Sequence, residues 1–185
     1  ERETSMVFSS AIFLLAFLPI VFISNYFIKK EYSNYLLLIA SLIFYAWGEP
    51  YLVLLMIFSI LVNWFFGILI DKTCNTSRKL ILAGGIIIDL SILGYFKYAG
   101  FFVKIINFAV GSNLFPIPKI SLPIGISFFT FQAISYIVDV YRGDTEASNN
   151  PVNVALYISF FPQLIAGPIV KYRDINKQIE QRSIR

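Results

Sequence analysis

Long runs without a charged residue are the feature that most restricts how this chain can fold. Phe8–Ile28 and Tyr51–Ile70 contain no Asp, Glu, Lys or Arg. A helix of about 20 apolar residues crosses a hydrocarbon core of about 30 Å. Inside lipid, only helices and closed barrels satisfy every backbone hydrogen bond. The runs therefore predict an all-α, polytopic transmembrane protein.

The composition agrees with this fold class. Hydrophobic residues make up 57% of the chain and charged residues 14%, whereas soluble domains carry about 25% charged residues. The single cysteine, Cys74, excludes an internal disulfide. The chain has no histidine, so it lacks the commonest general base.

Turn residues and charges divide the chain into segments. Gly48, Glu49 and Pro50 form a turn signal after the second apolar run. Residues 97–119, with their lysines and prolines, predict an interfacial helix followed by a loop. Residues 1–5, before Met6, are expected to be a tag or leader extension. The predicted spans are 8–28, 32–47, 51–70, 80–95 and 122–141, with a re-entrant segment over 152–170.

The distribution of Lys and Arg predicts an orientation. If these spans cross, Lys29, Lys30, the loop 71–79 and the C-terminal end share one side. The positive-inside rule makes that side cytoplasmic and the N-terminus external, in a bacterial plasma (inner) membrane. Anionic lipid headgroups account for the net charge of +4, so we expect no nucleic-acid partner.

The segment 122–143 places polar residues inside apolar sequence. At 100° per residue they occupy about a third of the helix circumference. Asp139 and Arg142 are spaced i,i+3 and can pair. The face either lines a polar tunnel or bonds neighbouring helices. Its members are Gln132, Ser135, Tyr136, Asp139 and Arg142.

The segment 152–170 contains helix breakers at membrane depth. Pro162, Gly167 and Pro168 make a straight span unfavourable. Freed backbone groups need protein or water partners, so we expect broken or re-entrant helices around a cavity. Gln163 can supply such a partner. The tunnel-lining candidates are Gln132, Tyr136, Asp139, Arg142 and Gln163.

Asp89 lies in the middle of the fourth predicted span. An isolated carboxylate there is expensive, so we expect it to be paired or protonated. Structural hydrogen bonding and ion-coupled transport both use such a residue. Asn25 and Asn63 are expected to form hydrogen bonds between helices. Gly84 and Gly85 permit close helix approach.

No soluble-enzyme motif gives a catalytic site: the chain has no GxSxG turn, phosphate-binding glycine loop or metal-ligand cluster. Five segments nevertheless resemble the membrane-bound O-acyltransferase family, and within it the alginate O-acetyltransferase branch, which is similar to peptidoglycan O-acetyltransferases and the teichoic acid D-alanyl transferase. They are MVFSSAIFLLAFLPIVF, YAWGEP, GYFKY, LPIGISFFTFQAISYIVDVYRG and SFFPQLIAGPIVKYRD.

This resemblance implies a ring of tilted helices around a thin centre, with a cytoplasmic donor pocket and an outward acceptor funnel. It also implies a catalytic histidine in a WHG-like motif that this chain does not contain. Residues 6–185 then resemble the N-terminal part of a longer membrane domain. We expect no catalytic residue in this part and no activity from it alone.

The implied reaction moves an acyl group, by resemblance acetyl, to hydroxyls of an extracellular polysaccharide. A base deprotonates the hydroxyl, which attacks a thioester in a dry site. Lys171 and Arg173 are candidates for contacts with an anionic donor. The expected cosubstrate is acetyl-CoA or an acyl-carrier protein, with no bound cofactor, and the expected partners are membrane lipid and a periplasmic or surface acyltransferase. The alternatives are a transporter or channel module and a non-catalytic membrane scaffold.

Overall fold

Every element in the described part of the chain is a helix, which confirms the predicted all-α class. The computed structural model describes residues 12–74, 76–111, 115–118, 125–166 and 170–180. A π-helical turn, η1, leads directly into α1. The elements are η1 (Phe13–Phe17), α1 (Leu18–Phe27), α2 (Lys30–Gly48), α3 (Val53–Lys72), α4 (Thr76–Val110), α5 (Ile126–Arg142), α6 (Pro151–Ser159), α7 (Phe161–Ala166) and α8 (Tyr172–Glu180).

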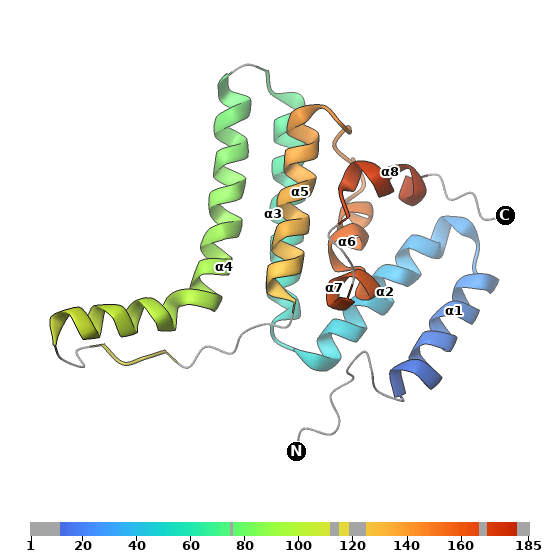
Figure 1. Ribbon diagram of the computed structural model, residues 1–185. Coiled ribbons are helices and arrows are strands. Elements are labelled where there is room, and N and C mark those ends of the chain that lie inside the picture. The colour runs from blue at the N-terminus through green and yellow to red at the C-terminus, as the bar shows by residue number, and fades with distance from the viewer. Residues whose placement is uncertain (1–11, 75, 112–114, 119–124, 167–169, 181–185) are drawn as a thin grey trace.

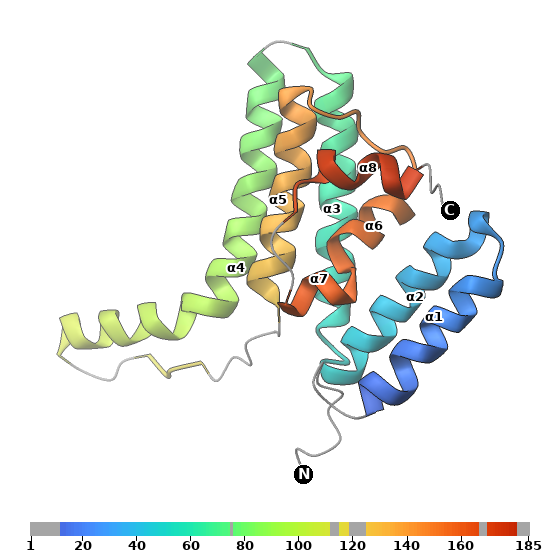
Figure 2. The same ribbon diagram turned by 45° about the vertical axis from the view of Figure 1, so that its right-hand side comes forward.

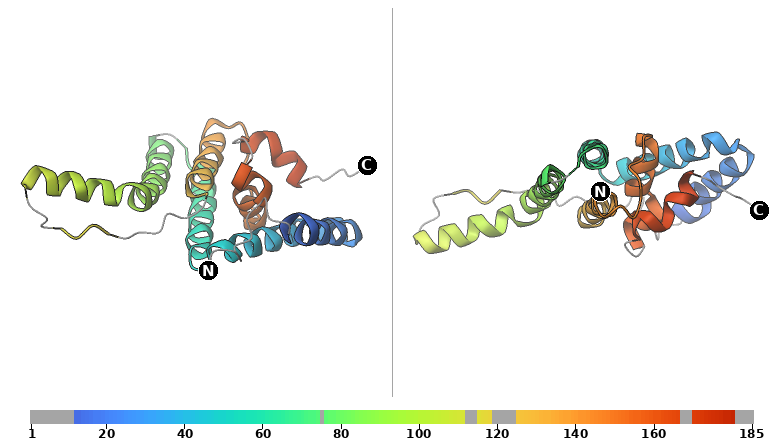
Figure 3. Two further views of the ribbon diagram at one scale, coloured as in Figure 1. Left: turned by 60° about the horizontal axis from the view of Figure 1, so that its bottom comes forward. Right: turned by 90° about the horizontal axis from the view of Figure 1, so that it is seen from above.

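Three long helices form the middle of the molecule. The helix α5 packs against both α3 and the first half of α4, and successive helices run in opposite directions (Figure 1). The short helices α6, α7 and α8 lie between this bundle and the α1–α2 pair (Figure 2). Seen from above, the elements form an elongated row (Figure 3). The polar face of α5 therefore lies near the centre of this row.

Two of the described helices, α3 and α4, are long and apolar enough to cross a membrane. Large apolar side chains cover their outer surfaces. Leu54, Phe58 and Phe65 on α3 are each more than half exposed, as are Leu80 and Ile87 on α4. An apolar surface of this kind suits contact with lipid or with further helices.

Glycines end α5 on both sides. Gly125 precedes the helix at φ +76° and Gly143 follows it at φ +75°, a region that residues with a Cβ rarely adopt. At the C-terminal end the N–H of Gly143 bonds the carbonyl of Val140, and the N–H of Asp144 bonds that of Asp139. These two bonds form a Schellman motif. The helix thus has fixed ends around its polar face.

The predicted end of a helix near Tyr95 is wrong. The helix α4 continues to Val110, and its second half bends away from the bundle (Figure 1). Isolated glycines such as Gly94 and Gly100 weaken a helix without ending it. Gly111 follows α4 at φ +68°, and the interfacial helix expected within 97–119 is an extension of α4.

The predicted re-entrant segment folds as two short helices that meet at Phe160. Asn150 caps α6 by accepting a hydrogen bond from the N–H of Val152, and Pro151 occupies its first turn. Pro162 lies in the first turn of α7, where a missing N–H is tolerated. The expectations for residues 1–11, for the start of the span at 122–124 and for Gly167 and Pro168 lie outside the described residues.

Candidate functional site

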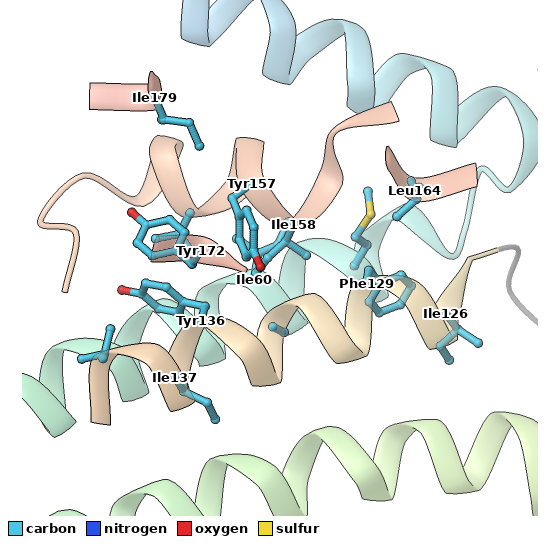
Figure 4. Close-up of a cluster of buried hydrophobic side chains, with 14 of the residues drawn as sticks. Ile60, Ile126, Phe129, Tyr136, Ile137, Tyr157, Ile158, Leu164, Tyr172 and Ile179 are labelled. Atoms are coloured by element: carbon cyan, nitrogen blue, oxygen red, sulfur yellow. The ribbon is translucent and has the colours of Figure 1, made fainter. Parts of the chain in front are cut away.

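The polar face predicted on α5 is buried over most of its length. Gln132, Tyr136 and Asp139 are each at most 3% exposed. Tyr136 points away from Ile137, whose side chain faces Gly85 on α4 (Figure 4). The face is therefore covered by other parts of the chain, and its neighbours come from α3, α6 and α8.

Three tyrosines from three helices meet over this face. The ring centroids of Tyr136 on α5 and Tyr172 on α8 are 4.8 Å apart, and those of Tyr172 and Tyr157 on α6 are 5.0 Å apart. Both pairs are edge-to-face, an arrangement that favours aromatic contact. Tyr136 and Tyr172 direct their hydroxyls the same way (Figure 4). We call Tyr136, Tyr157 and Tyr172 the tyrosine cluster.

The chain just before α8 supplies backbone partners to this region. The Tyr157 hydroxyl donates to the carbonyl of Val170 at 2.7 Å. The N–H of Arg173 donates to Asp139 Oδ2 at 3.3 Å. These two bonds fix residues 170–173 across the buried ends of α5 and α6.

The predicted pair between Asp139 and Arg142 is wrong. Asp139 is buried and bonds the backbone of Arg173, whereas Arg142 is exposed at the end of α5. No ion pair joins the two within the ranges that the structure describes. Arg173 instead forms ion pairs with Asp144 at 3.2 Å and Asp174 at 3.5 Å. A helix end leaves Arg142 free to extend into solvent, which costs less than burying its charge.

The other predicted site residues lie in different surroundings. Gln163 on α7 is buried, at 8% exposed, while Lys171 is exposed beside α8. The side chain of Arg173 is 42% exposed. The structure thus brings Tyr136 and Asp139 into one region with the backbone of Arg173, and it leaves Arg142 and Lys171 at the surface.

Close helix approach depends on two glycines. A Cβ at Gly67 would lie 2.6 Å from the Tyr136 ring, and one at Gly85 would lie 2.9 Å from Ile137 Cδ1. Gly85 was predicted to permit close packing, and this is confirmed. Gly67 was missed, because a lone glycine within an apolar run carries no signal of which side chain it faces.

A second buried polar group joins α3 to α4. Asn63 Nδ2 donates to Asp89 Oδ1 at 2.9 Å, and the Ser59 hydroxyl lies 3.5 Å from the same oxygen. The expected hydrogen bonding of Asp89 and of Asn63 between helices is confirmed. Asn25 likewise accepts from Ser33 between α1 and α2.

An apolar groove lies on another face, between α2, α3 and α6. Its volume is about 220 Å³, and its lining is almost entirely apolar. It is separate from the polar face of α5, whose side chains do not line it. The lining residues are Leu38, Leu42, Ile57, Ile60, Leu61, Pro151, Val152 and Ala155.

The buried face offers hydroxyl, amide and carboxylate groups, which can position a polar substrate. Sequence reasoning found Gln132, Tyr136 and Asp139 by their spacing on one helix. It missed Tyr157, near the end of α6, and Tyr172, at the start of α8, since a tyrosine at a helix end carries no indication that it points inward.

The chain is similar to bacterial O-acetylases over almost its full length. It is 46% identical over 186 residues to the probable alginate O-acetylase AlgI of Pseudomonas aeruginosa, covering 96% of this chain and 35% of that protein. It is 43% identical over 185 residues to the same-named protein of Azotobacter vinelandii, covering 96% of this chain and 37% of the relative. The chain is homologous to part of the membrane-bound O-acyltransferases.

A third relative is named for a different acceptor, peptidoglycan. The peptidoglycan O-acetyltransferase of Helicobacter pylori is 35% identical over 214 residues, covering 98% of this chain and 40% of that protein. The chain therefore spans between about a third and two fifths of the length of these relatives. No model of a protein family and no solved structure matches the chain.

Proposed function

We propose that this chain is part of a multi-pass membrane O-acyltransferase that transfers an acetyl group to hydroxyls of an extracellular polysaccharide. The observation that carries the proposal is 46% identity over 96% of the chain to a probable alginate O-acetylase. The relatives' names specify acetyl transfer to alginate and to peptidoglycan. The donor is acetyl-CoA or an acyl-carrier protein, and the catalytic histidine belongs to another part of the protein.

Within this enzyme, the buried face of α5 forms one wall of the acceptor passage. Gln132, Tyr136 and Asp139 line it, and Gln163 contributes from the broken segment formed by α6 and α7. Lys171 and Arg173, at the surface beside α8, contact the anionic donor. This assignment is supported by burial of a polar face at the junction of α5, α6 and α8. Arg142 lies at the cytoplasmic end of this wall, where it is exposed.

The proposed orientation places the joined ends of α3 and α4 in the cytoplasm and the N-terminus outside, in the inner membrane. The antiparallel packing of α3, α4 and α5 supports it, because Lys72, Arg78 and Arg142 lie at one end of the bundle (Figure 1). A periplasmic or surface acyltransferase acts on the outer side as a partner.

The activity is tested in cells that depend on the full-length protein for polysaccharide acetylation. We expect Gln132→Ala and Gln163→Ala to lower the O-acetyl content of the polysaccharide by about tenfold or more, because a displaced acceptor reacts slowly. Asn149→Ala, at an exposed position, is the control. Full acetylation by both variants at normal protein abundance would remove these residues from the site.

The orientation is tested at Cys74, which is exposed in the turn between α3 and α4. In full-length protein with Cys74 as its sole cysteine, we expect a membrane-impermeant thiol reagent to label it only after the cells are permeabilised. Labelling of intact cells would place this turn outside and reverse the proposed topology.

A further inference from the structure

The contact between α3 and α4 contains a polar group that the proposed acyl transfer does not use. Ser59 and Asn63 on α3 face Asp89 on α4, and all three are at most 2% exposed. Asp89 lies between Gly85 and Leu93 on the buried stripe of α4. A carboxyl group in this position needs its full set of hydrogen-bond partners.

The hydrogen bonds of this group leave two acceptors unfilled. Asn63 Nδ2 uses both of its hydrogens, one for the carbonyl of Ser59 at 3.0 Å and one for Asp89 Oδ1 at 2.9 Å. Asp89 Oδ2 and Asn63 Oδ1 are buried, and neither has a hydrogen-bond partner among the described residues. The described side chains therefore supply no hydrogen-bond donor for these two oxygens.

The backbone cannot supply the missing donor. Asn63 and Asp89 lie in helix interiors, where the N–H groups already bond carbonyls of the preceding turn. The Ser59 hydroxyl points to Oδ1 rather than to either unfilled atom. Neither the helix backbone nor the Ser59 hydroxyl therefore supplies this donor.

No cation supplies it either, within the part of the chain that the structure describes. Lys97 on α4 is eight residues beyond Asp89, about 12 Å along the helix axis. None of the charged or titratable groups on the three packed helices has a hydrogen bond or ion pair to Asp89. These groups are Asp71 and Lys72 on α3, Arg78, Lys79, Tyr95, Lys97, Tyr98 and Lys104 on α4, and Tyr136, Asp139, Tyr141 and Arg142 on α5.

A single proton satisfies both unfilled acceptors. The 2.9 Å bond joins Asn63 Nδ2 to Asp89 Oδ1. Asp89 Oδ2 shares its carbon with Oδ1, and Asn63 Oδ1 shares its carbon with Nδ2. A hydrogen on Asp89 Oδ2 therefore faces Asn63 Oδ1 when the carboxyl and amide groups are coplanar. We propose that Asp89 and Asn63 form a proton-binding site between α3 and α4, in which the neutral carboxyl donates to the amide oxygen and accepts from the amide nitrogen.

A metal ion fits this site less well than a proton. Hard cations such as Ca²⁺ take about six to eight oxygen ligands, and only three side chains meet here. Loss of the proton to solvent leaves a buried carboxylate in which neither Asp89 Oδ2 nor the neighbouring Asn63 Oδ1 has a donor among the described residues. Because α3 and α4 both pack on α5, proton loss loosens the support of the polar face.

Infrared spectroscopy of the full-length protein in phosphatidylcholine vesicles tests the site at neutral pH. We expect a carbonyl band of a protonated carboxylic acid that Asp89→Asn removes and Asn63→Leu shifts. The control Asp144→Asn, at a surface ion pair, should remove only carboxylate absorption. Loss of carboxylate absorption in Asp89→Asn would overturn the proposal.

Two further measurements separate other outcomes. If the acid band appears only after sodium is removed, the occupant is a metal ion and the proposal fails. Labelling aspartate carboxyl groups with ¹³C in the unaltered protein gives a readout that does not depend on a variant's folding. A spectrum without any protonated aspartate at neutral pH excludes the proton-binding site.

Discussion

Two buried polar groups in this chain obtain their hydrogen bonds in different ways. The tyrosine cluster with Asp139 is crossed by residues 170–173, whose backbone supplies a carbonyl to Tyr157 and an N–H to Asp139. The Asn63–Asp89 pair lies between two continuous helices, whose backbone N–H groups are used within each helix, although the Ser59 carbonyl also accepts from Asn63. Irregular chain can offer backbone N–H donors to a buried carboxyl group, whereas facing helices must supply its donors from side chains or from a bound proton.

The largest expected effect tests how tightly the tyrosine cluster is packed. We expect Gly67→Ala to destabilise the protein by about 3 kcal/mol, because its Cβ would lie 2.6 Å from the Tyr136 ring. That ring also packs edge-to-face against Tyr172, which limits how far it can move away. The thermal unfolding midpoint of the purified protein measures the loss.

Gly94→Ala is the matched control for this substitution. It also places a Cβ in a helix interior, but no atom lies within 4 Å of it. Helix propensity then predicts a gain of up to about 1 kcal/mol. Equal effects of the two substitutions would show that the contact with Tyr136 is not what restricts position 67.

The second prediction concerns the Asn63–Asp89 pair. Asn63→Leu should cost about 2 kcal/mol, because it leaves the Asp89 carboxyl buried without its partner. Replacing both residues by leucine should recover most of this loss, since an apolar pair needs no hydrogen bonds. The free energies of unfolding of Asn63→Leu, Asp89→Leu and the double variant give the coupling energy between the two side chains. Additive losses would mean that the two side chains act independently.

The sequence predicts which residues of these two buried polar groups share a helix face, but not which distant residues they bond. The helices α2, α3 and α5 follow from apolar runs bounded by glycine, proline and charge. Helical spacing places Gln132, Tyr136 and Asp139 on one face of α5, which the structure shows to be buried. Partners come from packing, which periodicity does not describe. Asn63 and Asp89 are 26 residues apart, and Asp139 bonds a backbone group 34 residues away. The i,i+3 neighbour Arg142 was predicted instead, because only local pairs are visible in a sequence.

The third prediction measures what one backbone partner contributes to the tyrosine cluster. Tyr157→Phe keeps the ring contact with Tyr172 and removes only the hydroxyl that bonds the Val170 carbonyl. We expect a loss of about 1 kcal/mol. Hydrogen exchange should increase at the start of α8, because this bond helps to hold the preceding residues. Unchanged exchange there would assign the position of α8 to its other contacts.

The smallest effect is expected at the surface beside the same helix. The guanidinium of Arg173 bonds the exposed Asp144 and Asp174, and surface ion pairs contribute about 0 to 1 kcal/mol. Arg173→Gln should therefore change the unfolding midpoint little, since the backbone N–H that bonds Asp139 remains. If Arg173 contacts the anionic donor, the same variant should raise the donor KM in the full-length enzyme more than it lowers kcat. A large loss of stability with an unchanged KM would instead mean that the Arg173 side chain holds α8 in place. The tyrosine cluster would then depend on a side chain as well as on backbone partners, and it would differ less from the Asn63–Asp89 pair.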